Sequence, residues 1–231
     1  MIVAKRKPFA EIKELAAGYD KVLIVGCGTC VAVCLAGGEK EVSILASQLS
    51  MASRLGGRDV KIDEATIERQ CDREFLTDLA GKANPADYDA VISMACGAGV
   101  QLFAEVYDRS VVIPALNTAF IGVAEGPGIW SARCRSCGDC VLGETAGICP
   151  VTMCAKSLLN GPCGGTRNGK CEVNGEADCA WAKIYERLSA RGKLDSITKV
   201  IPGAKNSMDS HPSVLIHEAY KRRLNKDGKI V

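Results

Sequence analysis

The sequence is poor in histidine, in aromatic residues and in net charge. Its 231 residues include 2 histidines and 5% aromatics, and the formal net charge is +2. So small a net charge does not indicate a nucleic acid or an anionic membrane as partner, and few aromatics weaken any base-stacking mode of binding. Because His211 and His217 lie far from the cysteine clusters, any bound metal is expected to be held mainly by sulfur.

The chain also lacks a long apolar run. The one candidate for a membrane span, residues 22–38, is shorter than the roughly 20 apolar residues that a span needs and contains 4 glycines. We therefore expect a strand, a turn and a short helix there, and no membrane span. The first twenty residues have no apolar core of a signal peptide, which predicts a cytoplasmic protein with reduced thiols.

Common catalytic and nucleotide motifs are missing as well. There is no G-x-S-x-G, no P-loop and no H-E-x-x-H in the sequence. The stretch GCGTCV at residues 26–31 has two glycines of the dinucleotide fingerprint, but Val31 stands where the third is needed. We predict no catalytic residues and no cofactor site in this chain beyond metal ligands.

Strand-like and helix-like patterns alternate over residues 1–120. Apolar runs that end in glycine predict buried strands at 21–26 and 88–97, and spacings of three and four predict a helix over 39–55. Shorter strands are expected at 58–62 and 110–116, with helices at 66–82 and 100–108. This alternation predicts the α/β class, with a small parallel sheet.

The rest of the chain reads differently. Residues 121–133 contain glycine and proline and are expected to form a linker. Residues 134–190 are rich in turn residues and cysteine, so we expect a loop-rich domain that bound metal organises, ending in a helix. On that helix Trp181, Ile184, Tyr185 and Leu188 are expected on one side. Residues 191–231 are expected to form an extended, partner-binding tail.

Cysteine is the residue in excess, with 13 in the chain. In a reducing compartment, dense cysteine usually means bound metal. The first three cysteines of the loop-rich domain match the start of the ferredoxin run C-x2-C-x2-C-x3-C-P, which favours an iron–sulfur cluster over zinc. This triplet is Cys134, Cys137 and Cys140. Cys149 stands before Pro150, but too late for the ferredoxin spacing, and is one of five candidates for the fourth ligand.

Four cysteines follow in the same domain and form a second group. Four thiolates can hold a structural zinc as well as a second cluster, and the sequence leaves both open. We call this group the distal thiols: Cys154, Cys163, Cys171 and Cys179. Basic residues lie between these cysteines and could offset the charge of an anionic metal site, although a solvated surface would look the same.

A further group of cysteines follows the predicted strands of the first domain. Parallel strands end at one edge of a sheet, where such folds build sites, and helix geometry places Cys30 and Cys34 on one face. We therefore expect a third sulfur-ligated site, an iron–sulfur cluster, at this edge. Its predicted ligands are Cys27, Cys30, Cys34 and Cys96. Cys71 is expected in a helix and packed in the core, with a ligand role as the alternative.

Several motifs resemble a known family. CRSCGDC at 134–140 and LNGPCGG at 159–165, with VGCGTCVAVCLAGGEKEV at 25–42 and VIPALNTAFIG at 112–122, resemble the small subunit (MetV type) of acetogen-type methylenetetrahydrofolate reductase. The resemblance covers roughly residues 20–190 and includes the cysteine-rich methylenetetrahydrofolate reductase C-terminal-like domain.

The resemblance implies a function and partners. It implies a non-catalytic subunit of an oxidoreductase complex in acetogenic one-carbon metabolism, with two or more 4Fe–4S clusters and zinc possible at one site. The subunit would pass electrons to a flavin-containing catalytic subunit that reduces methylenetetrahydrofolate to methyltetrahydrofolate. Its electron donor would be a ferredoxin-, NADH- or heterodisulfide-reductase-linked module.

Two other functions remain open at this point. The chain could be a zinc-stabilised scaffold that activates the same reductase without carrying electrons. Alternatively, the α/β half could handle a pterin or corrinoid through zinc held by thiolates, since such zinc with an open position can be catalytic.

Overall fold

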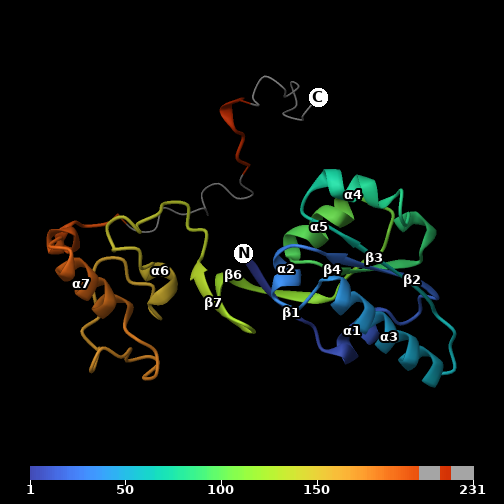
Figure 1. Cartoon of the computed structure of the whole chain (residues 1–231), viewed down its shortest axis with the longest axis horizontal. Helices are drawn as coiled ribbons and strands as arrows, with labels where there is room; N and C mark the ends of the chain where they lie inside the picture. The colour runs from blue at the N-terminus through green and yellow to red at the C-terminus, as the bar shows by residue number, and fades with distance from the viewer. Residues whose placement is uncertain (203–213, 220–231) are drawn as a thin grey trace. The chain divides into compact units, whose positions relative to one another are not determined.

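The structure, a computed structural model, describes residues 1–202 and 214–219 (Figure 1). The chain divides into two compact units, Met1–Arg133 and Cys134–Val231. The first unit has two clusters of buried apolar side chains, and the second unit has one.

A four-stranded sheet forms the centre of the first unit. Its strands are β2 (Lys21–Cys27), β3 (Lys61–Ile67), β4 (Ala90–Met94) and β5 (Val112–Pro114). Their order is β3-β2-β4-β5, and every neighbouring pair is parallel. The predicted α/β class is therefore confirmed.

Helices cover both faces of this sheet (Figure 1). Side chains alternate along β2, so Val22 and Ile24 pack in one apolar cluster while Leu23 and Val25 pack in the other. The first cluster contains residues of α1 (Phe9–Leu15), the short α2 (Cys30–Val33) and α3 (Glu39–Leu55). The second contains residues of α4 (Arg73–Leu79) and α5 (Gly97–Val106).

Helix α3 has the bounds that the sequence predicts. The Glu41 carboxylate accepts a hydrogen bond from the Gly38 backbone N–H at 3.0 Å and caps its first turn. Gly56 and Gly57 follow its last residue, and Gly57 has a φ of +74°, which favours glycine. The terminal Leu55, expected on the apolar face, is 90% exposed instead.

The helix expected over residues 66–82 is wrong in its first part. Residues up to Ile67 extend β3 and pair with β2, and a 3-10 turn, Pro85–Asp87, follows α4 and precedes β4. Helix α4 begins only after Asp72, whose side chain accepts a hydrogen bond from the Glu74 N–H at 3.2 Å. Cys71 therefore lies in the loop between β3 and α4, not inside a helix.

The linker expected at residues 121–133 is also wrong. A second, three-stranded sheet of order β1-β6-β7 contains β1 (Ile2–Arg6), β6 (Leu116–Gly126) and β7 (Ile129–Cys134). Strand β6 pairs antiparallel with β1 and joins β7 through the two residues Pro127 and Gly128. The glycine and proline that suggested a linker mark this hairpin turn.

The second unit has little regular structure but does have an apolar core. It contains α6 (Pro150–Met153), α7 (Ala180–Ala190) and the 3-10 turn Leu194–Thr198. Trp181, Ile184 and Leu188 of α7 are buried against Ala146 and Ile148. Tyr185, expected on the same side, is 55% exposed. This segment therefore has more apolar packing than its composition indicates.

Among the described residues, no helix is long and apolar enough to cross a membrane. The expected tail at 191–231 lies largely in residues 203–213 and 220–231, outside the described part of the chain. Within the described part of the tail, residues Val214–Ala219 are exposed.

Candidate metal centres

All thirteen cysteines are free thiols in this structure. They fall into groups in space as well as in sequence. One group lies at the carboxyl edge of the parallel sheet, and another lines a small cavity in the second unit.

Three predicted ligands lie at the carboxyl edge of the parallel sheet. Cys27 is the last residue of β2, Cys30 is the first residue of α2, and Cys96 is the N-cap of α5, just after β4. Cys27 is buried, whereas Cys30 and Cys96 are half-buried. Because β2 and β4 are parallel neighbours, their ends place these thiols at one edge.

Cys34 has a different environment from the other three. Its Sγ lies 3.3 Å from the carbonyl oxygen of Cys30 and 3.6 Å from that of Val31, within its own turn. A third carbonyl, that of Ile2 in β1, is 4.0 Å away. The thiol is 6% exposed and belongs to the apolar cluster beneath α3. Helix α2 ends at Val33, so the i, i+4 relation with Cys30 holds only at the helix end.

Cys71 was expected in the core, but the structure places it in an exposed loop at the sheet edge. Burial of its sulfur is the largest cause that raises the pKa of Cys71, followed by the negative charges of Cys27, Cys96 and Cys30. These thiols therefore lie close enough to interact electrostatically. Asp72 is the N-cap of α4, and an N-cap residue directly after Cys71 is a sequence signal that could have placed Cys71 before the helix.

The distal thiols all line one small cavity in the second unit, of about 20 Å³. Trp181 forms part of its wall and is held by a hydrogen bond from its Nε1 to the Leu158 carbonyl at 2.8 Å. Pro162, Thr166 and Val173 also line the cavity. The grouping of these four cysteines in sequence thus corresponds to a grouping in space.

Charged side chains surround this cavity. Lys156 and Glu172 both line it and form an ion pair with each other. The pKa of Glu172 is lowered, first by its hydrogen bond with Lys156 and then by one from the Cys163 thiol. Glu172 raises the pKa of Lys156, and the charges of Cys163 and Cys154 raise it further. A cation therefore stands beside two of the distal thiols.

Cys171 is prepared for the thiolate form by the backbone. Hydrogen bonds from the N–H groups of Asn174, Val173 and Ala155 lower the pKa of this thiol. Further out, Lys170 and Lys183 contact the Asp178 carboxylate at 2.6 Å and 2.5 Å and lower its pKa to about 2. Backbone N–H groups directed at sulfur are typical of sulfur ligands in metal sites.

The triplet lies on the loop that follows β7. Cys134 and Cys140 are exposed, and Cys137 is half-buried. Ser136, at a φ of +52°, directs its N–H to the Cys134 Sγ at 3.4 Å. Cys149 caps α6, and its thiol contacts the Thr152 hydroxyl at 3.6 Å.

Within residues 1–202 and 214–219, no three histidine, cysteine, aspartate or glutamate side chains form a group that could hold a metal ion as they stand. The distal thiols line one cavity without converging on one point, and the sheet-edge thiols lie on neighbouring loops at the ends of β2, β3 and β4. Binding would therefore require small side-chain movements.

Comparison with known proteins identifies the cysteine-rich part of the chain. Residues 113–207 match the family model described as methylene-tetrahydrofolate reductase C terminal. No curated protein and no solved structure matches the chain at a significant level.

The matched segment includes the triplet, Cys149 and the distal thiols, and α7 contributes to the apolar cluster of this part of the chain. The matched segment begins within β5, so it also takes in the hairpin of β6 and β7. The cysteines of the sheet edge lie before the matched segment.

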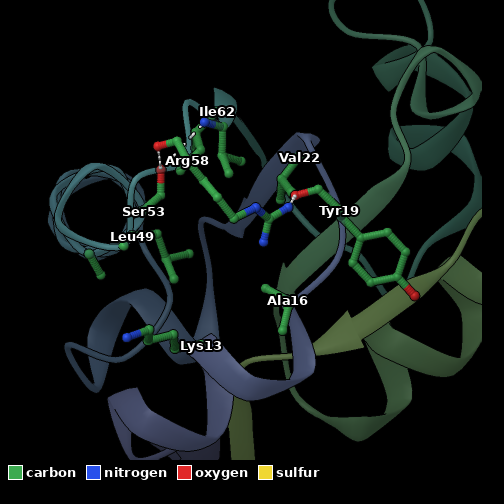
Figure 2. A pocket seen from close by; sticks show the side chains of 12 residues that line it. Lys13, Ala16, Tyr19, Val22, Leu49, Ser53, Arg58 and Ile62 are labelled. Carbon is green, nitrogen blue, oxygen red and sulfur yellow. Dashed lines mark hydrogen bonds between the residues drawn. The ribbon is translucent and has the colours of Figure 1, made fainter.

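A second cavity, of about 140 Å³, lies at the opposite, amino edge of the parallel sheet (Figure 2). Leu49, Val22 and Ile62 contribute apolar walls, and the Arg58 guanidinium donates to the Tyr19 carbonyl at 3.1 Å. No cysteine lines it. It is smaller than the 300–1,000 Å³ typical of cofactor pockets, which makes it a poor pterin site.

Proposed function

We propose that the chain is the small iron–sulfur subunit, of the MetV type, of a methylenetetrahydrofolate reductase. In this role it delivers electrons to the flavin of a separate catalytic subunit. The observation that carries the proposal is the family match, because it links the segment that holds eight of the 13 cysteines to this reductase. The absence of catalytic motifs in the sequence agrees with chemistry at a partner's active site.

The donor set suits iron–sulfur clusters. Thiolates are the usual protein ligands of such clusters, and the triplet has the ferredoxin spacing of three of them. A bound 4Fe–4S cluster supplies one-electron redox chemistry. The loop from Cys134 to Cys140 offers its sulfurs at the surface, and the Ser136 N–H already contacts one of them. Exposed thiols of this kind would place redox chemistry where a partner can reach it.

The distal thiols suit zinc better than a cluster. Four thiolates form a common structural zinc site. A cavity of about 20 Å³ has room for one water-sized particle, so a single ion fits with small movements while a cubane would displace the walls. The N–H groups that stabilise the Cys171 thiolate and the cation of Lys156 both favour a site that carries negative charge. We therefore assign zinc to this group.

The proposal also assigns partners. The family match supports association with a reductase, and we propose a flavin-containing catalytic subunit as the electron acceptor. A ferredoxin-, NADH- or heterodisulfide-reductase-linked module is the proposed donor. Reduced clusters require reducing surroundings, so we propose a cytoplasmic location.

Metal analysis of the full chain, purified without oxygen, tests this function. We expect iron together with one zinc per chain, and an electron paramagnetic resonance signal after reduction with dithionite. Cys137→Ser should lower the iron content and spare zinc, whereas Cys171→Ser should remove zinc and spare iron. A colourless chain that contains zinc alone would contradict electron transfer.

That same outcome would favour a second function, a zinc-stabilised scaffold of the reductase. The observation that favours the scaffold function is the cavity lined by the distal thiols, because this cavity has room for a single ion. A scaffold would bind the reductase but leave its flavin potential and reduction rate unchanged. The iron content of the wild-type chain separates the two functions.

A further inference from the structure

We propose that Cys71, in place of Cys34, completes a four-sulfur iron–sulfur site at the carboxyl edge of the parallel sheet. This assignment rests on the proposed function, because it assumes that the edge binds a cluster. The revised sheet-edge set is Cys27, Cys30, Cys71 and Cys96. The cysteine that enters the set, Cys71, is the one that the sequence pattern placed inside the helix expected at residues 66–82.

Gln70 anchors the loop that carries Cys71. Its side chain is fully buried, and its Nε2 donates to the carbonyls of Val25 and Gly26, at 2.8 Å and 3.2 Å. Its Oε1 accepts a hydrogen bond from the Ser93 hydroxyl at 2.6 Å. One side chain therefore ties the loop to the ends of both β2 and β4. Cys71, the next residue, is held at the edge that these strands share.

The first turn of α5 packs against the same residue. A Cβ added at Gly99 would lie 3.0 Å from the Gln70 Cβ and 3.4 Å from its carbonyl carbon. Only glycine allows helix and loop to approach so closely. Cys96 immediately precedes α5, so this contact brings the start of that helix, and its cysteine, to the loop of Cys71.

The Cys27 sulfur also faces this loop. Its Sγ lies 3.8 Å from the carbonyl oxygen of Glu68, and the Gly28 N–H donates to the Ile67 carbonyl at 2.9 Å. The chain after β2 therefore runs along the beginning of the β3–α4 loop. Cys30 follows within the next turn, at the start of α2.

Cys34 is the cysteine that this arrangement leaves out. Its Sγ is surrounded by carbonyl oxygens of its own turn and of β1, and its side chain packs in the apolar cluster under α3. Three carbonyl oxygens lie within 4.0 Å of the Cys34 sulfur, against one for Cys27, and this favours a Cys34 thiol that donates a hydrogen bond over a thiolate.

The revised set fits the chemistry of a cluster. Four soft sulfur donors suit iron–sulfur clusters, and ligands on loops can adjust more easily than ligands fixed within a helix or strand. Cys71 is exposed, and Cys30 and Cys96 are half-buried, so the site would lie near solvent. A cluster there could exchange electrons with a protein bound at this edge.

The test compares Cys71→Ala with Cys34→Ala in the full chain, purified and reconstituted without oxygen. Cys71→Ala should lose about four irons per chain and the resonance signal of one cluster, and it should keep zinc. Cys34→Ala should keep the iron content and signal of the wild type. If its buried position prevents folding, Cys34→Ser provides the same comparison, with circular dichroism as the check on the fold.

The opposite result would overturn the assignment: full iron content in Cys71→Ala and loss of a cluster in a folded Cys34 variant. Equal iron content in both variants and the wild type would also overturn it, because Cys71 would not be a ligand. The failure of the proposed function looks different, since the wild-type chain itself would then contain no iron.

Discussion

At the scale of single residues, polar side chains at the sheet fix the paths of loops. Gln70 does so at the carboxyl edge, where it bonds to two carbonyls of β2 and to Ser93 of β4. Tyr88 does so nearer the amino edge, where its hydroxyl donates to the Asp63 carboxylate of β3 at 2.9 Å. Each contact joins a loop to a strand that is distant in sequence.

The Tyr88 contact should be visible in titration. Burial raises the pKa of Tyr88 to about 12, and the hydrogen bond to Asp63 contributes to the increase. Its stabilising effect is present below the ordinary tyrosine pKa of 10.0 and is lost as pH rises toward about 12. The pKa of Asp63 is lowered, chiefly by the bond from Tyr88, so its contribution is lost as pH falls below the ordinary 3.8.

We predict that the difference in tyrosinate absorbance between the wild type and Tyr88→Phe has a midpoint well above pH 10.0. Asp63→Asn should lower that midpoint without bringing it to the ordinary value, because burial is the larger cause. Absorbance titration of the three proteins, with circular dichroism to confirm folding at each pH, is the measurement. A midpoint at the ordinary tyrosine value would contradict the contact.

At the scale of elements, α7 supplies the apolar core of the second unit. Ile184 is 0% exposed and Leu188 is 2% exposed, while Tyr185 on the same helix is largely outside. The fold of residues 134–190 therefore depends on packing as well as on any metal. Metal alone was the sequence-based expectation, because the segment between the cysteines is nearly all turn residues.

Ile184→Ala should destabilise the second unit by about 2–5 kcal/mol, the usual cost of such a truncation in a core. Tyr185→Ala is the matched control and should change the free energy of unfolding by less than about 0.5 kcal/mol. Urea unfolding followed by tryptophan fluorescence measures both, because Trp181 is buried in the same cluster. Equal effects of the two changes would contradict the packing of α7.

Elements with strong local signals could be predicted from sequence. The apolar runs of β2 and β4 and the periodicity of α3, with glycines after it, correspond to the observed elements. The expected helix at 66–82 was wrong because Ile67, Cys71, Phe75 and Leu79 share a spacing of four by coincidence. Residues up to Ile67 form a strand because β3 pairs with β2, and this long-range pairing outweighs the helical spacing. Such pairing cannot be predicted from the residues of the segment alone.

The candidate sites also have features that the sequence could predict and features that depend on long-range contacts. Cys27 and Cys96 could be placed together from sequence because parallel strands end at one edge. The position of Cys71 could not, since it depends on the long-range contacts of Gln70. The distal thiols are neighbours in sequence and also line one cavity, but the small size of that cavity appears only in the fold.

At the scale of the whole molecule, the chain combines a parallel α/β unit with a cysteine-rich unit, and residues 113–207 match the family model described as methylene-tetrahydrofolate reductase C terminal. Sulfur is gathered in both units, at the sheet edge of one and around a cavity of the other. An electron carrier needs redox groups near its surface and no substrate chemistry of its own. The exposed Cys134 and Cys140 of the triplet and the exposed Cys71 agree with that requirement.

Electron delivery to the reductase flavin is the central claim, and rapid mixing tests it most directly. The anaerobic full chain is reduced with dithionite, freed of excess reductant, and mixed with its oxidised flavin-containing reductase subunit. We predict that the flavin absorbance bleaches, and that chain stripped of its iron gives no bleaching. A flavin that stays oxidised after mixing with the iron-loaded, reduced chain would contradict the account.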